Sequence, residues 1–462
     1  DDSDLEVTSS GSLERDQQGT ADLYTYNYWS SPVGAINTTA NNQSYTVPSL
    51  MRDGTTPAAP GVLNFITTGY DGNPAPIGVA DYWIWKFANQ SGNDATDYSF
   101  WQHVRSAGTI EVGEGFTMKG PGTGGIATLQ NYVFTGKPNN NDISLTINAG
   151  NDYLIGNPYP SAMDSHEFLD DNPLTGGTLY FWEHWGGGSH LLADYQGGYA
   201  QYNYSGGVGA ASYGTNDPDV GTGGTPVKLP GQYIPGSQGF FVFGTANGTI
   251  NFENDQRVFV TEGASSVFVR NGNTQISRTG EEDTRMKFRI GFNSVNEIHR
   301  QLLLTVDENA SSGVDWGYDG IIKEEQMDDM YWMIENDKYI IQGTNQVDVQ
   351  TIVPLGIHTR DEGMNEITID RLENVPTDVD IYIRDKELNI FHDLRQGNYQ
   401  IYLLACDYTD RFEIVFSDED PTLGIEDEIL ADKFDIHYSN DDDHIVIVNP
   451  EKTQIDSMEI YN

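Results

Sequence analysis

Residues 153–161 read YLIGNPYPS, and residues 26–34 read YNYWSSPVG. Both stretches are apolar and rich in aromatic residues, and both contain a proline at or near their end. Because proline cannot donate a hydrogen bond to a β ladder, each stretch predicts a strand that stops there or borders a sheet. Pro32 and Pro158 lie 126 residues apart. The similarity predicts that the chain carries one β unit twice.

Three further pairs of blocks follow in the same order along the chain. They are YWIWKF (82–87) and LYFWEH (179–184), VGEGFTMKG (112–120) and GSQGFFVFG (236–244), and NYVFTG (131–136) and GTINFE (248–253). In this match Trp85 corresponds to Trp182, and Phe116 corresponds to Phe240. The glycine before each phenylalanine permits a tight bend or a close backbone approach. We expect two similar β units that pack together, with Phe116 and Phe240 at equivalent strand positions.

Length and composition also favour β structure. The chain has 462 residues, which suggests two to four domains, and it contains 50 Gly and 26 Tyr. The fold class predicted is all-β, with tandem β-sandwich or jelly-roll-like modules and a small C-terminal β domain. The clearest helix is SAMDSHEFLDD (161–171), capped by Ser161 or Asp164, with three side chains facing inward. These three are Met163, Phe168 and Leu169.

The predicted organisation has seven parts. They are the end of a preceding β element (1–20), β repeat 1 (21–150), β repeat 2 (151–262), a linker (263–284), a β-sandwich (285–418), an acidic linker (419–432) and a partial C-terminal sorting domain (433–462). Seven short alternating or apolar runs after Arg285 have the rhythm of a β-sandwich. The start shows no signal peptide and reads as the end of an earlier element, so we expect a piece of a longer protein.

The last part of the chain holds three strand patterns, at Phe434–Tyr438, His444–Val448 and Ser457–Tyr461. A unit of roughly 40 residues is marginal by itself. Open strand edges in such a unit invite pairing with another chain. The tail is therefore predicted to be a separate recognition element, and the alternative is that it completes the preceding sandwich.

Charge excludes several partners. The chain has 24 Lys and Arg against 69 Asp and Glu, a formal net charge of −45. Phosphate binding needs clustered basic residues, so nucleic acid is excluded as a partner, and so is adhesion to an anionic membrane. No apolar run is long enough to predict a direct membrane span. The acidity fits either a solvated surface or calcium binding, and both interpretations remain open.

The sequence offers no strong catalytic motif. Cys406 is the only cysteine and lies in an apolar run, so a small buried hydrophobe is expected. Nine His residues show no metal-ligand spacing, and the Gly-rich stretch with Glu183, His184 and His190 is expected to be a polar loop rather than a metal site. Paired carboxylates for glycoside hydrolysis remain open, because 69 acids supply many pairs by chance.

Several turns carry Asp and Asn oxygens, which suit calcium. They are DGNPAPIG (71–78), NNNDIS (139–144), NDPD (216–219) and DWGYDG (315–320). The candidate calcium ligands are Asp71, Asn73, Asp315 and Asp319. The same residue types also favour turns for backbone reasons alone.

Four stretches carry a resemblance to a known family: LERDQQGTADLYTYNYWSSPVG (13–34), LIGNPYPSAMD (154–164), GSQGFFV (236–242) and RIGFNS…WGYDG…RFEIVF (289–416). They resemble the C-terminal regions of large surface proteins exported by the Bacteroidetes type IX secretion system. The tail resembles the type A sorting domain of that cargo, whose pattern is a strand, a polar turn, I.I.NP and I..IEIYN. The matching residues here are Ile436, Ile445, Ile447, Asn449, Pro450, Ile455, Met458, Ile460 and Tyr461. The family's tail continues past IYN, whereas this sequence stops at Asn462.

The resemblance implies a non-catalytic cell-surface protein of the adhesin or display type. Its tail would be recognised by the type IX outer-membrane translocon and its β-barrel shuttle. The alternative is a carbohydrate-binding or glycan-degrading surface protein that uses the aromatic, Gly-rich loops at 182–214, with surface glycans as partners. Exposed aromatic rings would favour the alternative, whereas the duplicated Trp85 and Trp182 predict burial.

Overall fold

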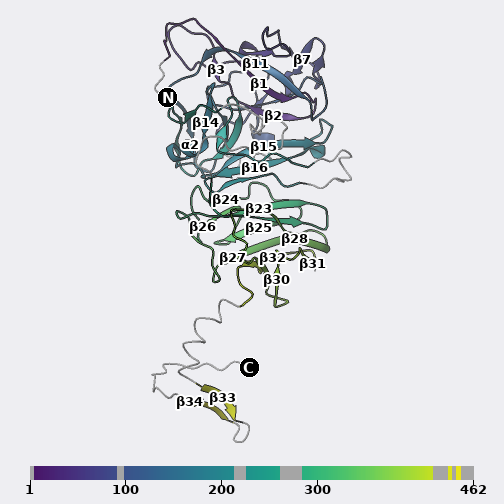
Figure 1. Ribbon diagram of the computed structural model, residues 1–462. Coiled ribbons are helices and arrows are strands. Elements are labelled where there is room, and N and C mark those ends of the chain that lie inside the picture. The colour runs from purple at the N-terminus through teal and green to yellow at the C-terminus, as the bar shows by residue number, and fades with distance from the viewer. Residues whose placement is uncertain are drawn as a thin grey trace.

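The computed structural model describes residues 5–90, 98–212, 225–260, 283–419, 435–439 and 444–448. Within these ranges the chain is almost entirely β, and the only α-helices are α1 (Val47–Leu50) and α2 (Ser165–Asp171) (Figure 1). The all-β prediction is confirmed.

Repeat 1 contains two pairs of long strands. The strand β1 (Leu13–Thr20) pairs with β11 (Leu129–Pro138), and β2 (Tyr26–Trp29) pairs with β10 (Phe116–Lys119). The other elements are β3 (Val33–Gly34), β4 (Met51–Asp53), β5 (Asn64–Ile66), β6 (Asn73–Pro74), β7 (Ile77–Ala80), β8 (Trp85–Lys86), β9 (Gln102–His103) and two 3-10 turns, η1 (Asp81–Trp83) and η2 (Tyr98–Phe100).

Repeat 2 has the same plan with a larger sheet. The strand β12 (Ile143–Ile147) pairs with β20 (Gly248–Phe252), and β13 (Asp152–Gly156) pairs with β19 (Gly239–Phe243). The sheet continues from β19 through β15 (Leu179–Gly186) and β16 (Gln196–Asn203) to β17 (Gly206–Val208). The other elements are β14 (Ala162–Asp164), β18 (Tyr233–Ile234), β21 (Arg257–Val258) and the 3-10 turn η3 (Leu192–Asp194).

The matched phenylalanines occupy equivalent positions, as the sequence predicts. Phe116 of β10 is opposite Trp29 of β2, and Phe240 of β19 is opposite Ile155 of β13. Trp29 and Ile155 are 126 residues apart in the sequence, and Phe116 and Phe240 are 124 residues apart.

The structure moves the predicted repeat boundaries toward the N-terminus. The strand β1 precedes β2 and pairs with the strand after β10, as β12 precedes β13 and pairs with the strand after β19. Residues 13–20 are thus part of repeat 1 rather than the end of a preceding element. Residues 143–147 likewise belong to repeat 2. The prediction assigned both segments to the wrong unit because the matched blocks begin after them.

The two repeats interlock through reciprocal hydrogen bonds. Ser30 N–H donates to the Ser237 carbonyl (2.9 Å), and Gly156 N–H donates to the Gly113 carbonyl (3.0 Å). The first bond joins repeat 1 to repeat 2, and the second is its counterpart with the roles exchanged. Such an exchange is what an approximate twofold axis between the repeats produces.

This exchange explains the glycine before each matched phenylalanine. A Cβ on Gly115 would lie 2.8 Å from the Ile155 carbonyl oxygen, and a Cβ on Gly239 would lie 2.9 Å from the backbone nitrogen of Trp29. Each glycine is therefore where the backbone of the other repeat approaches most closely, and a side chain there has no space.

Neighbouring residues of the matched strands serve different cores. Trp29 and Phe116 pack in the core of repeat 1, and Ile155 and Phe240 pack in the core of repeat 2. The adjacent residues Tyr28, Leu154 and Phe241 meet in a third core between the repeats. Both faces of these strands are buried, which is why the opening stretches are apolar without strict alternation.

The predicted helix is α2, and its cap is Asp164. The Asp164 carboxylate accepts a hydrogen bond from His166 N–H (2.9 Å), which satisfies one free donor of the first turn. Met163, Phe168 and Leu169 are fully buried, as predicted.

The third β body covers residues 283–419 and forms one eleven-stranded sheet. Its strands are β22 (Lys287–Asn293), β23 (His299–Val306), β24 (Gly320–Ile321), β25 (Asp329–Ile334), β26 (Asp337–Thr344), β27 (Ile352–Thr359), β28 (Gly363–Glu373), β29 (Tyr382–Asp385), β30 (Ile390–Asp393), β31 (Tyr399–Leu403) and β32 (Cys406–Val415). The sheet curves until its edges approach, since Tyr399 Oη donates to Asp385 Oδ2 (2.9 Å) between β31 and β29. The sandwich prediction is confirmed in this nearly closed form.

Two central strands, β25 and β27, are absent from the seven predicted runs. Pro354 lies inside β27, where a proline argues against a central strand. The structure tolerates it because Pro354 is exposed and lies next to an irregularity in the pairing with β32.

The expectation for Cys406 is wrong, because this residue is exposed. The strand β32 runs beyond the fully buried part of the core, which begins at Phe412. In its first half Tyr408 still packs against the core, but Cys406, opposite Thr359, is exposed.

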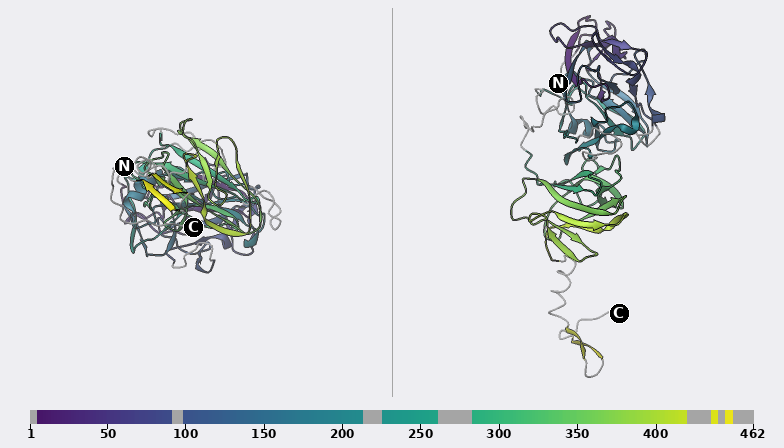
Figure 2. Two further views of the ribbon diagram at one scale, coloured as in Figure 1. Left: turned by 90° about the horizontal axis from the view of Figure 1, so that it is seen from below. Right: turned by 90° about the vertical axis from the view of Figure 1, so that its right-hand side faces the viewer.

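The third body lies against repeat 2, and in the right-hand view of Figure 2 the green third body is directly below the teal repeat 2. The strand β17 lies against β23, and the Arg289 guanidinium donates to the Gly207 carbonyl (2.8 Å). A buried ion pair joins Lys323 Nζ to Asp152 Oδ1 (2.6 Å) across the same junction.

In the tail, β33 (Asp435–Ser439) pairs antiparallel with β34 (His444–Val448), and Ile436 is opposite Ile447. These two strands of the tail match the prediction. The third predicted strand and the two linkers lie largely or wholly outside the described residues.

Candidate functional site

The most unusual group of side chains surrounds Lys119, where repeat 1 meets a loop of repeat 2. Lys119 ends β10 and is only 2% exposed. Its Nζ donates to the Tyr195 hydroxyl (2.6 Å) and to His190 Nδ1 (3.2 Å). Three rings enclose the ammonium, with their centroids at 3.8 Å for Trp83, 4.5 Å for Tyr26 and 4.6 Å for Tyr195. We call these residues the lysine cage.

Two effects oppose each other in the lysine cage. Burial disfavours the charged amine and lowers the pKa of Lys119 to about 7. The rings and the two hydrogen bonds favour the ammonium, because ring faces attract cations. Near neutral pH the Lys119 amine is therefore balanced between its charged and neutral forms, and its partners bind the charged form.

His190 connects the lysine cage to the surface. Its Nδ1 faces the Lys119 ammonium, which has no lone pair, so Nδ1 accepts and Nε2 carries the proton. The Nε2–H then donates to Asp71 Oδ1 (2.8 Å). Burial lowers the pKa of His190, which favours this neutral form. The candidate calcium ligand Asp71 thus binds a histidine, and 67% of its side chain is exposed.

The other residues of the predicted polar loop do not converge on a metal. His184 uses both ring nitrogens on the backbone, accepting from Tyr26 N–H (3.3 Å) and donating to the Gly186 carbonyl (2.7 Å). Burial lowers the pKa of His184 to about 3. The Glu183 carboxylate accepts the N–H groups of Val227 and Lys228. Glu183 and His184 thus lie buried on the strand β15, so the prediction of a polar loop is wrong for these two residues.

A row of partly exposed rings lies beside the lysine cage on repeat 1. We define the aromatic row as Tyr70, Tyr82, Trp85 and His103. The ring centroids are 4.8 Å apart from Tyr70 to Tyr82 and 5.8 Å apart from Tyr82 to Trp85. Trp85 stacks on His103 at 3.8 Å, because β8 and β9 place the two residues directly opposite. Tyr70 is 54% exposed.

The described part of the loops at 182–214 exposes fewer aromatic rings than the carbohydrate-binding alternative predicts. Trp185, Tyr199 and Tyr202 are buried, and Tyr199 and Tyr202 pack inside the cores of the repeats. Trp85 and Trp182 are both partly exposed, so neither is fully buried as the duplication suggests. By comparison, Tyr70 on repeat 1 is 54% exposed.

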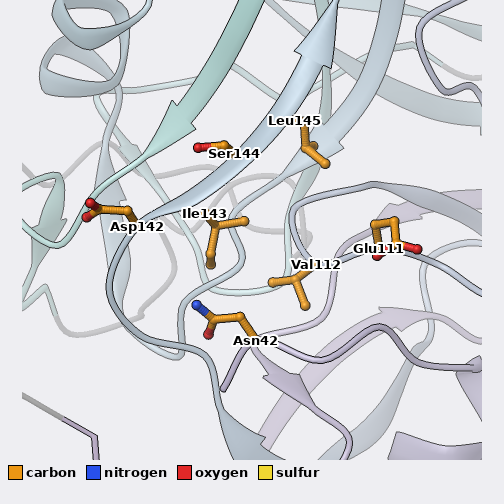
Figure 3. A pocket seen from close by; sticks show the side chains of 7 residues that line it. All are labelled: Asn42, Glu111, Val112, Asp142, Ile143, Ser144 and Leu145. Atoms are coloured by element: carbon orange, nitrogen blue, oxygen red, sulfur yellow. The ribbon is translucent and has the colours of Figure 1, made fainter. Parts of the chain in front are cut away.

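A cavity of about 260 Å³ opens between the repeats, away from the aromatic row (Figure 3). Val112, Ile143 and Leu145 form its apolar part, and the polar residues at its rim are Asn42, Glu111, Asp142 and Ser144. Figure 3 shows Glu111 and Asp142 on opposite sides of the cavity. Glu111 and Asp142 are the acidic residues among those that line it.

The other candidate calcium ligands serve the backbone. Asp315 accepts from Ser311 N–H, and Asp319 accepts from the N–H groups of Asp315 and Gly343. Burial raises the pKa of Asp319 to about 7. Asn73 lies on β6. Among the described residues, the one group of three acids close enough to share an ion is Asp171, Glu253 and Asp255. Calcium binding therefore stays a prediction.

The sequence reasoning missed Lys119, Tyr70, Tyr82 and Arg105. One signal was available for Lys119: the repeat match places it where repeat 2 has Phe243. A lysine at a position of a buried apolar strand is a strong departure from pattern.

For the predicted export residues, Ile436, Ile445 and Ile447 lie on the described strands of the tail. The remaining ones are Asn449, Pro450, Ile455, Met458, Ile460 and Tyr461, which lie outside the described residues. Among the described residues no helix has the length and apolar character needed to cross a membrane.

These features define an all-β protein with two interlocked repeats joined to a third β body. The model of the family "Domain of unknown function (DUF8693)" matches residues 75–416, and the chain belongs to this family. The matched range begins inside repeat 1 and ends with the third body. No curated protein matches the chain, and no solved structure matches it.

Proposed function

We propose that this chain belongs to a non-catalytic cell-surface protein of the adhesin or display type that leaves the cell through the type IX secretion system. Repeat 1, repeat 2 and the third body present a surface outside the cell. The tail is the address read by the outer-membrane translocon and its β-barrel shuttle. The observation that carries this proposal is that β33 and β34 pair with each other and with no other described strand.

The physical argument concerns the edges of this hairpin. An isolated two-stranded hairpin is marginally stable in water, and both outer edges present unpaired N–H and C=O groups. A partner that adds a strand satisfies these groups, and pockets for alternate side chains then give specificity. The tail is suited to being bound, and it adds no described strand to the third body.

Two further observations support a separate tail. The family match stops at residue 416, before β33 begins. The sequence pattern around Ile445, Ile447, Asn449 and Pro450 resembles the type A sorting domain, which implies the translocon and shuttle as partners.

Deletion of 424–462 from the full-length protein in its native host tests this proposal. We expect the truncated protein to keep its melting temperature and to accumulate in the periplasm. The double variant Ile436→Asp, Ile447→Asp should have the same export defect. Leu404→Asp is the matched control, because it makes the same change at an exposed site of the third body. A truncated protein that still reaches the surface contradicts the export role, and one that unfolds shows a structural role.

A further inference from the structure

The aromatic row stands on a rigid scaffold. Tyr70 is fixed through its carbonyl, which accepts from Trp83 Nε1 (2.6 Å). Trp85 and His103 are held by the pairing of β8 with β9, and His103 Nε2 donates to the Tyr82 carbonyl (2.8 Å). Rings that are already fixed lose little entropy when a ligand covers them.

An arginine side chain lies over one ring of the aromatic row. The Arg105 guanidinium lies 5.4 Å from the centre of the Tyr82 ring, and 43% of its side chain is exposed. Arg105 has a backbone φ of +53°, a conformation that arginine rarely adopts. Its N–H donates to the Ile84 carbonyl (3.1 Å), which helps to hold this strained turn. Such strain persists where the surrounding structure requires it, often at binding sites.

The aromatic residues of repeat 2 that correspond to the aromatic row are less accessible. Trp182 is opposite Tyr199, as Trp85 is opposite His103. The Tyr199 ring is buried in the core between the repeats, and its backbone N–H donates to Glu324 of the third body (2.9 Å). In repeat 2 the sheet continues into β17, and the third body lies against it. In repeat 1 no described strand continues the edge beyond β9, and its rings remain accessible.

We propose that the aromatic row is a binding site for a neutral glycan. A pyranose ring has an apolar C–H face, which suits a flat aromatic surface, and a polar edge of hydroxyl groups. Arg105 can donate to such hydroxyls, and Asp71 and the free Nδ1 of His103 can accept from them. The net charge of −45 opposes anionic ligands, so the glycan is neutral. The site deepens the proposed surface role by naming what the surface binds.

The test uses the full purified chain and three soluble neutral polysaccharides, namely mixed-linkage β-glucan, xyloglucan and galactomannan, with alginate as the anionic comparison. A neutral glycan array extends the set. Affinity electrophoresis and titration calorimetry measure binding. We expect at least one neutral probe to bind and alginate not to bind. Tyr70→Ala and Arg105→Ala should each weaken that binding by about fivefold, because stacked aromatic contacts and hydrogen bonds are each worth about 1 kcal/mol.

Tyr402→Ala is the matched control, since Tyr402 is 55% exposed on the third body and lies far from the aromatic row in sequence and fold. Its binding should equal that of the unaltered chain. The proposal is overturned if no neutral glycan binds, if only alginate or a protein partner binds, or if Tyr70→Ala binds as tightly as Tyr402→Ala. Because binding is measured on the purified protein, its outcome does not depend on whether the tail is an export signal.

Discussion

Repeat 1 and repeat 2 share the strands at their common axis and differ at their outer edges. At the axis, β2 with β10 and β13 with β19 have the same pairing and the same close glycine contacts. At the edge, repeat 2 extends through β16 and β17 and carries the third body, whereas repeat 1 ends at β9 with exposed rings. The comparison teaches that the axis constrains sequence through backbone contact, while the edges are free to acquire different partners.

A second difference lies at the end of the matched strands. Repeat 2 has Phe243 where repeat 1 has Lys119. The lysine survives in a buried position because three rings, a hydroxyl and an imidazole surround it. The same fold position thus holds a simple apolar residue in one repeat and a polar network in the other.

The largest effect is expected from breaking the shared axis. In Gly239→Val the new side chain meets the backbone of Tyr28 and Trp29, which cannot move without disrupting the other repeat. We expect a loss of more than about 4 kcal/mol in the free energy of unfolding, measured by urea denaturation.

Gly231→Val is the control for this variant, because a Cβ on Gly231 meets nothing within 4 Å. Its unfolding free energy should change by less than about 0.5 kcal/mol. Equal effects of the two variants would show that the close contact at the axis does not constrain this glycine.

A smaller effect is expected at the junction that repeat 2 makes with the third body. Asp152 is fully buried and pairs with Lys323 of the third body at 2.6 Å. Asp152→Ala leaves the Lys323 ammonium buried without its partner, and we expect a loss of about 3 kcal/mol by the same measurement.

Glu325→Ala removes a carboxylate that pairs with Lys338 at the same distance, but 50% of its side chain is exposed. That variant should lose less than about 1 kcal/mol, because water screens exposed pairs. If Asp152→Ala costs no more than Glu325→Ala, the junction does not depend on the buried pair.

The smallest effect concerns the lysine that distinguishes repeat 1. Burial places the pKa of Lys119 at about 7 in the folded state, below the ordinary 10.5. Between these values the unfolded chain binds more protons, so stability rises with pH. From about pH 7 to about pH 9 the unaltered chain should gain about 2 kcal/mol relative to Lys119→Met. Parallel stability profiles of the two proteins would contradict this, and would mean that the aromatic rings keep the ammonium charged.

Much of the fold followed from local patterns. The duplicated blocks predicted the equivalent positions of Phe116 and Phe240, and the capping pattern predicted α2. The strand β27 was not predicted, and it contains Pro354, which the structure tolerates beside an irregular pairing with β32. The prediction that Cys406 is buried was wrong, because an apolar run can extend beyond the core that covers it.

The candidate site was less predictable, because its residues come from distant parts of the chain. The sequence drew attention to Asp71, His190 and Trp85 separately, and for different reasons. Only folding brings Asp71 to His190 and His190 to Lys119, across 119 and 71 residues. No local pattern encodes such separations.

The sequence by itself determined that the chain is β-rich, acidic and internally duplicated, because turn residues, charge and repeated blocks are local properties. The tertiary structure decided which aromatic rings are buried and which are accessible. The rings of Tyr199 and Phe241 are buried because folding packs them against Tyr28 of repeat 1, more than a hundred residues away in the sequence. No described strand continues the sheet of repeat 1 beyond β9, and Tyr70 and His103 remain exposed there.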